Sequence, residues 1–250
     1  GNDVVRENAV IHYKPDGETT DYVEYTGRPV VRTSGRYIQT PNRTLLGNVM
    51  PDFFGGVNNA FTYKDFNFSF LVDFRKGGVQ FSVTDWFGNY AGIMEATAVT
   101  NPNGMNVRDP VSEGGGVLVE GVYGTLNTDG TVQFTDADGN PVETPVENTT
   151  YADGNVYFET DYWGKPGLSV FDASFVKLRE IVAGYTFRDV TPWLQSINVA
   201  IVGRNLWLIH DNMPHVDPEN SISAGTTSVG MNSTPIPSAR TIGFNVKVSF

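Results

Sequence analysis

The residues best able to do chemistry gather in one short segment. It reads His210-Asp211-Asn212-Met213-Pro214-His215-Val216-Asp217-Pro218-Glu219, and so it holds two histidines and three carboxylates. Imidazole and carboxylate groups are ligands that zinc uses in proteins. The segment also contains two prolines, and its histidines and acids have no regular spacing. A polar outer loop is therefore favoured over a metal site.

A second segment, Asp136-Ala137-Asp138-Gly139-Asn140, begins like a calcium-binding loop. Its glycine stands at the fourth position rather than the sixth that such a loop requires, although Glu147 does stand at the twelfth. Asp, Asn and Gly are also the residues that build tight turns. We therefore expect a turn here and no metal.

Enzyme motifs are missing from the rest of the sequence. There is no cysteine, which excludes thiolate nucleophiles, disulfide frameworks and Cys-ligated zinc. No nucleophile elbow, phosphate-binding loop or zinc-protease helix motif occurs. A carboxylate pair for glycoside hydrolysis stays open, because 28 acidic residues offer many pairs and no spacing selects one. We expect a protein that is not an enzyme and needs no cofactor.

Aromatic side chains form the third group of interest. Each ring has a flat apolar face that can stack on a sugar or hold a peptide. The alternative is that these rings pack long loops against one another. The candidates for substrate contact are Trp86, Tyr90, Tyr157, Tyr162 and Trp163, and Phe87, Tyr123 and Tyr151 lie in the same stretch.

Composition narrows the fold class. The 250 residues include 27 glycines and 14 prolines, which disfavours a helical bundle and favours many turns. The net charge of −11 argues against nucleic-acid binding, which needs a basic face. No run of 18 uncharged apolar residues predicts a transmembrane helix. The chain opens with Gly1-Asn2-Asp3, without methionine, and we interpret this start as an internal boundary or a tag remnant.

Several segments alternate between apolar and polar residues, which is the pattern of β-strands. Residues 66–74 place four phenylalanines and a valine on one side, and residues 57–63 before them complete a hairpin. Residues 242–250, 197–201 and the second half of 175–187 alternate in the same way. The connections between these strands alternate between short turns and long polar stretches. This pattern predicts an all-β antiparallel meander.

This meander divides the sequence into four parts. We expect an outer loop region over 1–46, a hairpin over 47–74, a long loop region with small hairpins over 75–173, and three strands with one long loop over 174–250. One weak hairpin is centred on Asp129-Gly130.

The apolar faces are unusually aromatic, and the opposite faces are small or polar. Outer-membrane β-barrels have lipid on one side of each strand and a watery lumen on the other. In that interpretation some polar residues line the transport route or contact a plug, whereas the alternative is that they only satisfy one another inside a wet interior. The lumen-facing candidates are Asn67, Asp73, Asn198, Arg204, Asn245 and Lys247, and the candidate assembly signal at the terminal strand is Phe244, Val246, Val248 and Phe250.

Five segments, in order, resemble the SusC/RagA branch of TonB-dependent outer-membrane transporters. They are Gly47-Asn48-Val49-Met50-Pro51-Asp52-Phe53 with Tyr63-Lys64-Asp65-Phe66; Ser174 to Arg179 (SFVKLR) with Ala183-Gly184-Tyr185-Thr186; Arg204-Asn205-Leu206; Asp217-Pro218-Glu219; and Arg240 to Phe244 leading to Phe250. Residues 1–46 and 75–173 are similar only in character.

The resemblance implies a 22-stranded transmembrane β-barrel around a plug, which imports glycans or peptides across the outer membrane of a Gram-negative bacterium. It implies a SusD-like surface lipoprotein, TonB acting through an N-terminal region that this sequence does not contain, and surrounding lipid and lipopolysaccharide as partners, with no nucleic acid. Twenty-two strands need about 200–240 residues before any loops. Because only about five such strands are visible here, we expect the chain to be the C-terminal part of a transporter, completed by other strands and a plug.

A secreted β-sandwich that binds carbohydrate is the alternative of a different class. In a sandwich, a second protein layer covers the apolar faces, whereas in a barrel lipid covers them. The exposure of Phe68, Phe70, Phe244 and Val246 distinguishes the two.

Overall fold

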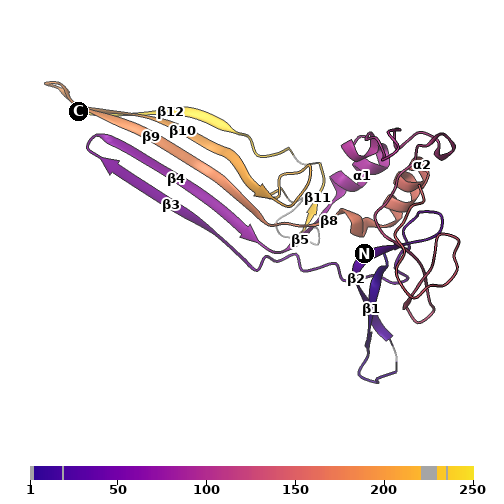
Figure 1. The fold of residues 1–250 in the computed structure, drawn as a ribbon. Helices are drawn as coiled ribbons and strands as arrows, with labels where there is room; N and C mark the ends of the chain where they lie inside the picture. Colours follow the sequence, from indigo (N-terminus) through magenta and orange to yellow (C-terminus); the bar gives the residue numbers. More distant parts are fainter. Residues whose placement is uncertain (1–2, 19, 221–229, 235) are drawn as a thin grey trace. The chain divides into compact units, whose positions relative to one another are not determined.

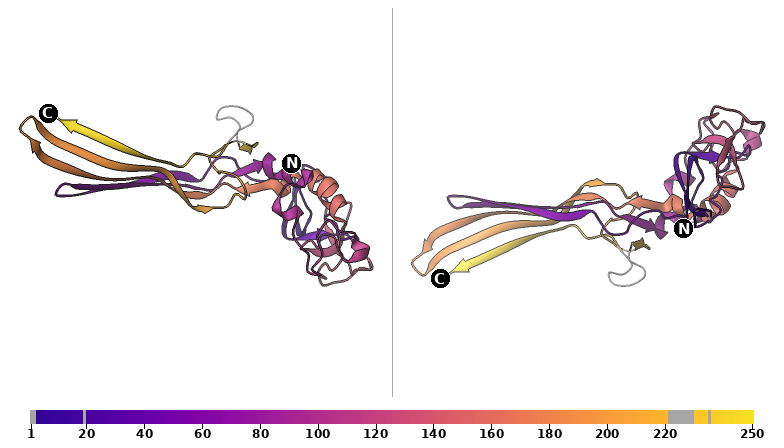
Figure 2. Two further views of the ribbon diagram at one scale, coloured as in Figure 1. Left: turned by 90° about the horizontal axis from the view of Figure 1, so that it is seen from above. Right: turned by 90° about the horizontal axis from the view of Figure 1, so that it is seen from below.

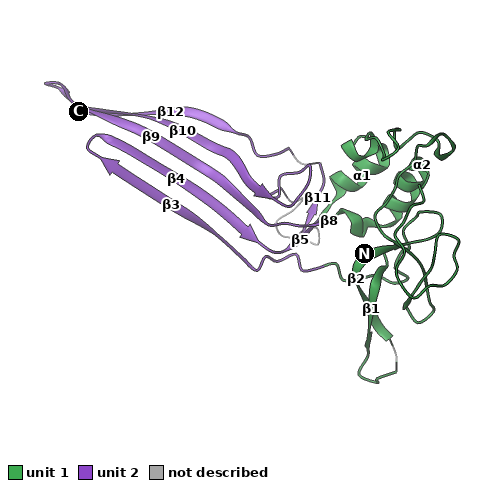
Figure 3. Cartoon of the chain, viewed as in Figure 1, with its two compact units in different colours: residues 1–46, 81–170 green, residues 47–80, 171–250 purple. Residues whose placement is uncertain are grey.

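The computed structural model describes residues 3–18, 20–220, 230–234 and 236–250. The chain divides into two compact units (Figure 3): unit 1 comprises residues 1–46 and 81–170, and unit 2 comprises residues 47–80 and 171–250. The predicted ranges 47–74 and 174–250 fall within unit 2. The range 1–46 falls within unit 1, as does most of 75–173.

Unit 2 contains one open sheet of five antiparallel strands, in the order β12-β10-β9-β4-β3. The strands run side by side in Figures 1 and 2, with β12, in yellow, at one edge. Their bounds are Phe53–Tyr63 (β3), Phe66–Lys76 (β4), Phe175–Thr191 (β9), Leu194–Asp211 (β10) and Thr241–Ser249 (β12). The order confirms the predicted antiparallel meander.

Two short turns join the neighbouring strands. Residues 64 and 65 link β3 to β4, and residues 192 and 193 link β9 to β10. Lys64 takes a left-handed conformation with φ of 54°, which a tight hairpin turn needs. The polar link predicted over 188–192 was too long, because β9 continues to Thr191 past a bulge where Asp189 has φ of 48°.

The register gives this sheet two chemically different faces. Across β4, β9, β10 and β12, Phe68 pairs with Ala183, Ala183 with Ile201, and Ile201 with Phe244. One residue along, Asn67 pairs with Gly184, Gly184 with Ala200, and Ala200 with Asn245. Because paired residues share a face and successive residues alternate, most of the large apolar residues lie on one side. The exceptions include Leu71, Val182 and Val202, which lie on the side of Asn67.

Unit 1 contains a smaller sheet, in the order β1-β2-β6-β7. Its strands are Arg6–Tyr13 (β1), Thr20–Val31 (β2), Val122–Leu126 (β6) and Val132–Phe134 (β7). The β6–β7 pair is the hairpin predicted around Asp129-Gly130. β2 and β6 run parallel, which brings Val30 and Val31 beside Val122 and Tyr123 in the buried core of the unit.

Short helices interrupt the region expected to be loops and hairpins. They are α1 (Val83–Ala91), α2 (Gly154–Val156), a π-helix (Tyr157–Tyr162) and three 3₁₀ turns (Glu95–Thr97, Val111–Glu113, Pro166–Ser169). Ser82 caps α1 by accepting a hydrogen bond from the backbone N–H of Asp85, and Gly92 ends it with φ of 71°. The fold is therefore mostly β with a few short helices, which is consistent with the predicted all-β class.

Three short strands complete the structure. They are β5 (Val79–Ser82), β8 (Val170–Asp172) and β11 (Met231–Asn232). The chain passes from one unit to the other between residues 46 and 47, within β5 and within β8. No helix among the described residues is long and apolar enough to cross a membrane.

Glycine 35 allows a test of the core of unit 1. Gly35 has φ of 72°, and a Cβ there would lie 2.3 Å from the carbonyl oxygen of Thr150. Gly17 has a similar φ of 74° with nothing within 4 Å of a Cβ. We expect Gly17→Ala to cost about 1–2 kcal/mol from backbone strain, and Gly35→Ala to cost about 1–3 kcal/mol more from overpacking. Thermal unfolding of the two variants measures the difference, and equal losses would contradict the contact.

Candidate functional site

The polar face of unit 2 carries all six residues predicted to face a lumen. The register places Asn67, Asp73, Asn198, Arg204, Asn245 and Lys247 on the same side of the sheet. The amide of Asn198 donates to Thr186 Oγ1 at 2.9 Å and to Asn67 Oδ1 at 3.3 Å. Arg204 pairs with Glu180 at 2.8 Å. Many polar groups on this face therefore form hydrogen bonds or ion pairs with one another. The role of the face as a lumen wall stays a prediction.

A charged network lies at the end of β9 where the sheet meets its long loops. Lys177 Nζ donates to Glu219 Oε2 at 2.7 Å, to Asp217 Oδ2 at 3.2 Å and to Ser238 Oγ at 2.7 Å. The side chains of Lys177 and Asp217 are only 5% and 7% exposed. Breaking such a buried pair leaves a charge without a partner, which is costly. The network therefore fastens the loop after β10 to β9.

Arg179 extends the network to the neighbouring strands. Its guanidinium donates to Asp73 at 2.7 Å, to both carboxylate oxygens of Glu219, and to Asn205 Oδ1 at 3.1 Å. Asn205 sits at a bulge of β10 with φ of 50°, a conformation that Asn tolerates. Three of the sequence motifs, SFVKLR, RNL and DPE, therefore meet at one place in the fold. Nothing local in the sequence signalled this contact, because Asp73 and Glu219, which both bind Arg179, lie 146 positions apart along the chain.

The two loop carboxylates of this network are held in the charged form. Burial raises the pKa of Glu219, but the hydrogen bonds from Arg179 and Lys177 outweigh it and lower the pKa below its ordinary value. Burial likewise raises the pKa of Asp217, but bonds from the Ser238 hydroxyl and from the backbone N–H groups of Glu219 and Ser238 bring it below the ordinary value. Both groups stabilise the folded loop at pH values above the ordinary pKa of their carboxyl groups, and this contribution is lost as the pH falls through their lowered pKa values.

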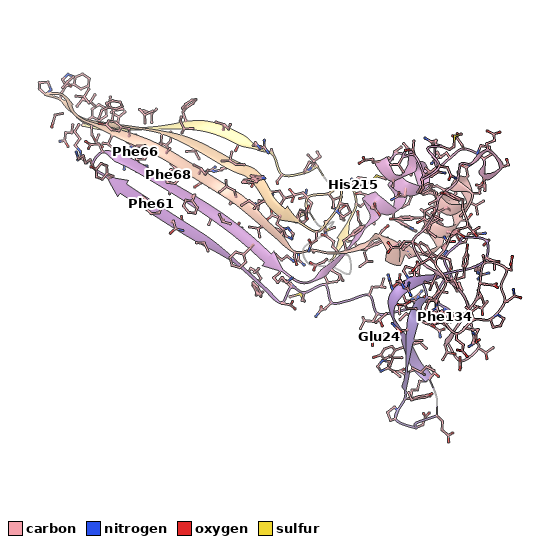
Figure 4. All side chains as sticks on the ribbon, in the orientation of Figure 1. Glu24, Phe61, Phe66, Phe68, Phe134 and His215 are labelled. Carbon is pink, nitrogen blue, oxygen red and sulfur yellow. The ribbon has the colours of Figure 1, made fainter. Side chains whose placement is uncertain are left out.

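The opposite face of the sheet is apolar and uncovered. Phe244 and Val246 are 76% and 60% exposed, and Phe68 and Phe70 are partly exposed. Figure 4 labels Phe61, Phe66 and Phe68 on β3 and β4, and the rings of Phe61 and Phe68 stack with centroids 6.4 Å apart. A contiguous apolar surface of this kind marks contact with another apolar phase.

The aromatic residues with polar atoms lie toward the ends of this face. Tyr63, Tyr185 and Trp193 stand near the short turns, and Trp207 stands toward the other end, where it pairs with Leu178. Apart from Asn59 and Gly203, the middle of the face holds phenylalanine, isoleucine, valine and alanine. The residues of the expected assembly signal, Phe244, Val246 and Val248, lie on this face in β12, and Phe250 follows them with its ring stacked on that of Trp193. Their role in assembly stays a prediction.

In unit 1, a buried carboxylate positions the loop aromatics. Asp85 is 4% exposed and accepts hydrogen bonds from Tyr162 Oη at 2.6 Å, Ser169 Oγ at 2.7 Å and Asn89 Nδ2 at 3.1 Å. Burial, together with the charge of Asp85, raises the pKa of Tyr162, so its hydroxyl keeps the proton that it donates. These bonds hold α1 against the end of the π-helix and against the 3₁₀ turn Pro166–Ser169. The sequence did not identify Asp85 as a residue that positions these aromatic side chains.

The residues next to Asp85 and Tyr162 form an aromatic stack. Trp86 and Trp163 lie with ring centroids 4.0 Å apart and planes 8° from parallel, and Trp86 Nε1 donates to the Trp163 carbonyl oxygen at 3.1 Å. Phe87 and Tyr90 contact Trp163 and remain 48% and 44% exposed. This cluster offers ring surface to solvent, and its contact with substrate stays a prediction.

The other loop aromatics serve mainly to pack unit 1. Tyr157 is 9% exposed and lies in the core with Val31, Tyr123 and Phe158. Tyr123 is fully buried, and its hydroxyl bonds to Thr149 and Thr150. For Tyr157, and for Tyr162 bonded to Asp85, the geometry matches the alternative that these rings pack the loops.

The two segments that resembled metal sites have other roles. No group of three or more histidine or acidic side chains among the described residues is placed to hold a metal ion. Asp217 and Glu219 belong instead to the network around Lys177. Asp136 Oδ1 accepts the backbone N–H groups of Asp138 and Asn140, which makes the tight turn that the sequence predicted.

No protein-family model matches the sequence, and no curated protein matches it. In fold, the chain is similar to two solved structures of the RagAB peptide importer. The first, in the open-open state, has a TM-score of 0.50 and 13% identity over 96% of this chain and 24% of the solved chain. The second, in the closed-closed state, has a TM-score of 0.51 and 13% identity over 96% of this chain and 25% of the solved chain. The chain thus has the fold of about a quarter of those chains, and spans only that share of their length.

Removing Lys177 tests whether the charged network fastens the loop. We expect Lys177→Met to cost about 3–5 kcal/mol, because Asp217 stays buried without its cation. Arg204→Met removes an ion pair whose arginine is 65% exposed, and we expect it to cost less than about 1 kcal/mol. Denaturant unfolding and limited proteolysis of the loop after β10 compare the two variants. Equal effects would show that the network does not hold the loop.

Proposed function

We propose that this chain is part of an outer-membrane nutrient importer, with unit 2 in the barrel wall and unit 1 among the outer loops. The observation that carries this proposal is the one-sided sheet: five strands in register place most of their large apolar residues on one face and mainly small or polar residues on the other. Lipid on one side and water on the other account for both faces at once.

The length of the apolar face supports a bilayer as its partner. On β9 it runs from Phe187 to Leu178, which is roughly 30 Å at about 3.3 Å per residue. A tilt of about 40° reduces this to roughly 23 Å, near the band of about 25 Å found in outer-membrane barrels. Tyrosine and tryptophan toward both ends match the aromatic girdles of such barrels.

The proposed nutrient class rests on the similarity of this chain to other transporters. The solved neighbours are a peptide importer, and the SusC/RagA resemblance covers importers of peptides or glycans. On this basis the polar face lines a lumen closed by a plug, a SusD-like lipoprotein covers the outer opening, and TonB supplies the energy. The exposed cluster of Trp86, Phe87, Tyr90 and Trp163 contacts arriving substrate.

The secreted β-sandwich is less well supported. A sandwich buries the apolar face of each sheet against a second sheet. Here Phe244 and Val246 are exposed, and the two buried clusters of apolar residues lie in unit 1 rather than on this face.

A charge placed on either face distinguishes a lipid contact from a water contact. Ile201 lies midway along the apolar face, and Asn245 lies on the opposite face. We expect Ile201→Arg to cost about 2–4 kcal/mol in a bilayer and Asn245→Arg to cost little. Urea unfolding in lipid vesicles and the amount of folded protein in the outer membrane give the comparison. If both variants fold equally well, lipid does not cover the apolar face.

Uptake by cells tests the import function itself. We expect deletion of the gene to abolish growth on either a mixture of short peptides or a mixture of oligosaccharides as sole nutrient, because passive diffusion of such solutes is slow. Complementation with the wild-type gene and with Gly17→Ala restores growth. Unchanged uptake of both mixtures after deletion would refute the proposal.

A further inference from the structure

Unit 1 contains a cleft of about 280 Å³ whose charged lining is mainly basic. Its walls are Arg32, Ser34, Arg36, Tyr37, Gln39, Thr160, Asp161 and Lys165. Three of these side chains are cationic and one is a carboxylate, in a chain whose net charge is −11. The cleft is therefore a local region of positive charge on an acidic protein.

A tight turn brings two of the cations together. The backbone N–H of Arg32 donates to the carbonyl oxygen of Arg36 at 2.9 Å, and Gly35, with φ of 72°, donates to the carbonyl oxygen of Arg32. The two arginines thus stand opposite each other at the base of a three-residue turn. Like charges in this position repel each other, so an anion between them would relieve the repulsion.

Asp161 neutralises only part of this charge. Arg36 donates to both of its oxygens, at 2.6 and 2.9 Å, and Lys165 Nζ donates to Oδ1 at 3.0 Å and to the Asp161 carbonyl oxygen at 3.3 Å. Lys165 is 4% exposed, and burial lowers its pKa; the bonds to Asp161 oppose this effect, and the charges of Arg36 and Arg32 add to it. One carboxylate therefore holds two cations in place, and Arg32 is left exposed at the rim.

We propose that this cleft binds the carboxylate group of a ligand. Guanidinium groups have a planar fork of donors that matches a carboxylate, and Ser34 and Thr160 add hydroxyl groups at the rim. The cleft is smaller than most sites for whole ligands, so it suits one end of a molecule. Asp161 disfavours a doubly charged phosphate more than a singly charged carboxylate. The carboxylate belongs to a peptide C-terminus or to an acidic sugar.

Calorimetric titration of the whole purified protein in detergent at low salt tests this proposal independently of import. The probes are trialanine against trialanine amide, and galacturonate against galactose. We expect the charged member of at least one pair to bind and its neutral counterpart not to bind, and the pair that responds identifies the source of the carboxylate. Arg32→Gln weakens that binding about tenfold, as the loss of one charge-assisted hydrogen bond predicts.

Arg43→Gln is the matched control, because Arg43 is an exposed arginine of unit 1 that does not line the cleft. We expect it to leave the affinity unchanged. Arg32 is itself exposed and makes no side-chain bond that the described structure records, so its replacement leaves the fold intact. The proposal is wrong if neither charged probe binds more tightly than its neutral counterpart. It is also wrong if the two variants have the same effect.

Discussion

The sheet of unit 2 depends on one constraint. No second layer of its own unit covers its apolar face among the described residues, so this face is stable only in contact with another apolar phase. The strict pairing of Phe68, Ala183, Ile201 and Phe244 across four strands serves this constraint, since a slip of one residue would turn the apolar side chains toward the polar side. The small residues Gly184 and Ala200 on the other face follow from the same register.

Hydrogen-bonded charged groups fix the irregular segments outside the sheet strands. Lys177 and Arg179 hold the loop carboxylates Asp217 and Glu219, and within unit 1 Asp85 holds Tyr162 and Ser169. In both places a few fully bonded polar groups fix irregular backbone, which has no repeating hydrogen-bond pattern of its own. The substrate-facing chemistry that we propose for unit 1 depends on this order.

The sequence predicted the strands well, because alternation is a local signal. Residues 66–74 and 242–250 show it clearly; the first range lies in β4 and the second, except for Phe250, lies in β12. Helix α1 was missed although Ser82, Asp85 and Gly92 are its start and stop signals, because a nine-residue helix shows little periodicity. The site was less predictable still: Arg36 and Asp161 meet from 125 positions apart, and no local pattern encodes such a contact.

The outermost strands of the five-stranded sheet, β3 and β12, each have a strand neighbour on one side only among the described residues. Each therefore presents a row of free backbone donors and acceptors along its outer rim. Two such rims, one at each margin, make the sheet extensible in both directions. A further strand can therefore pair with either margin without rearranging the strands already present.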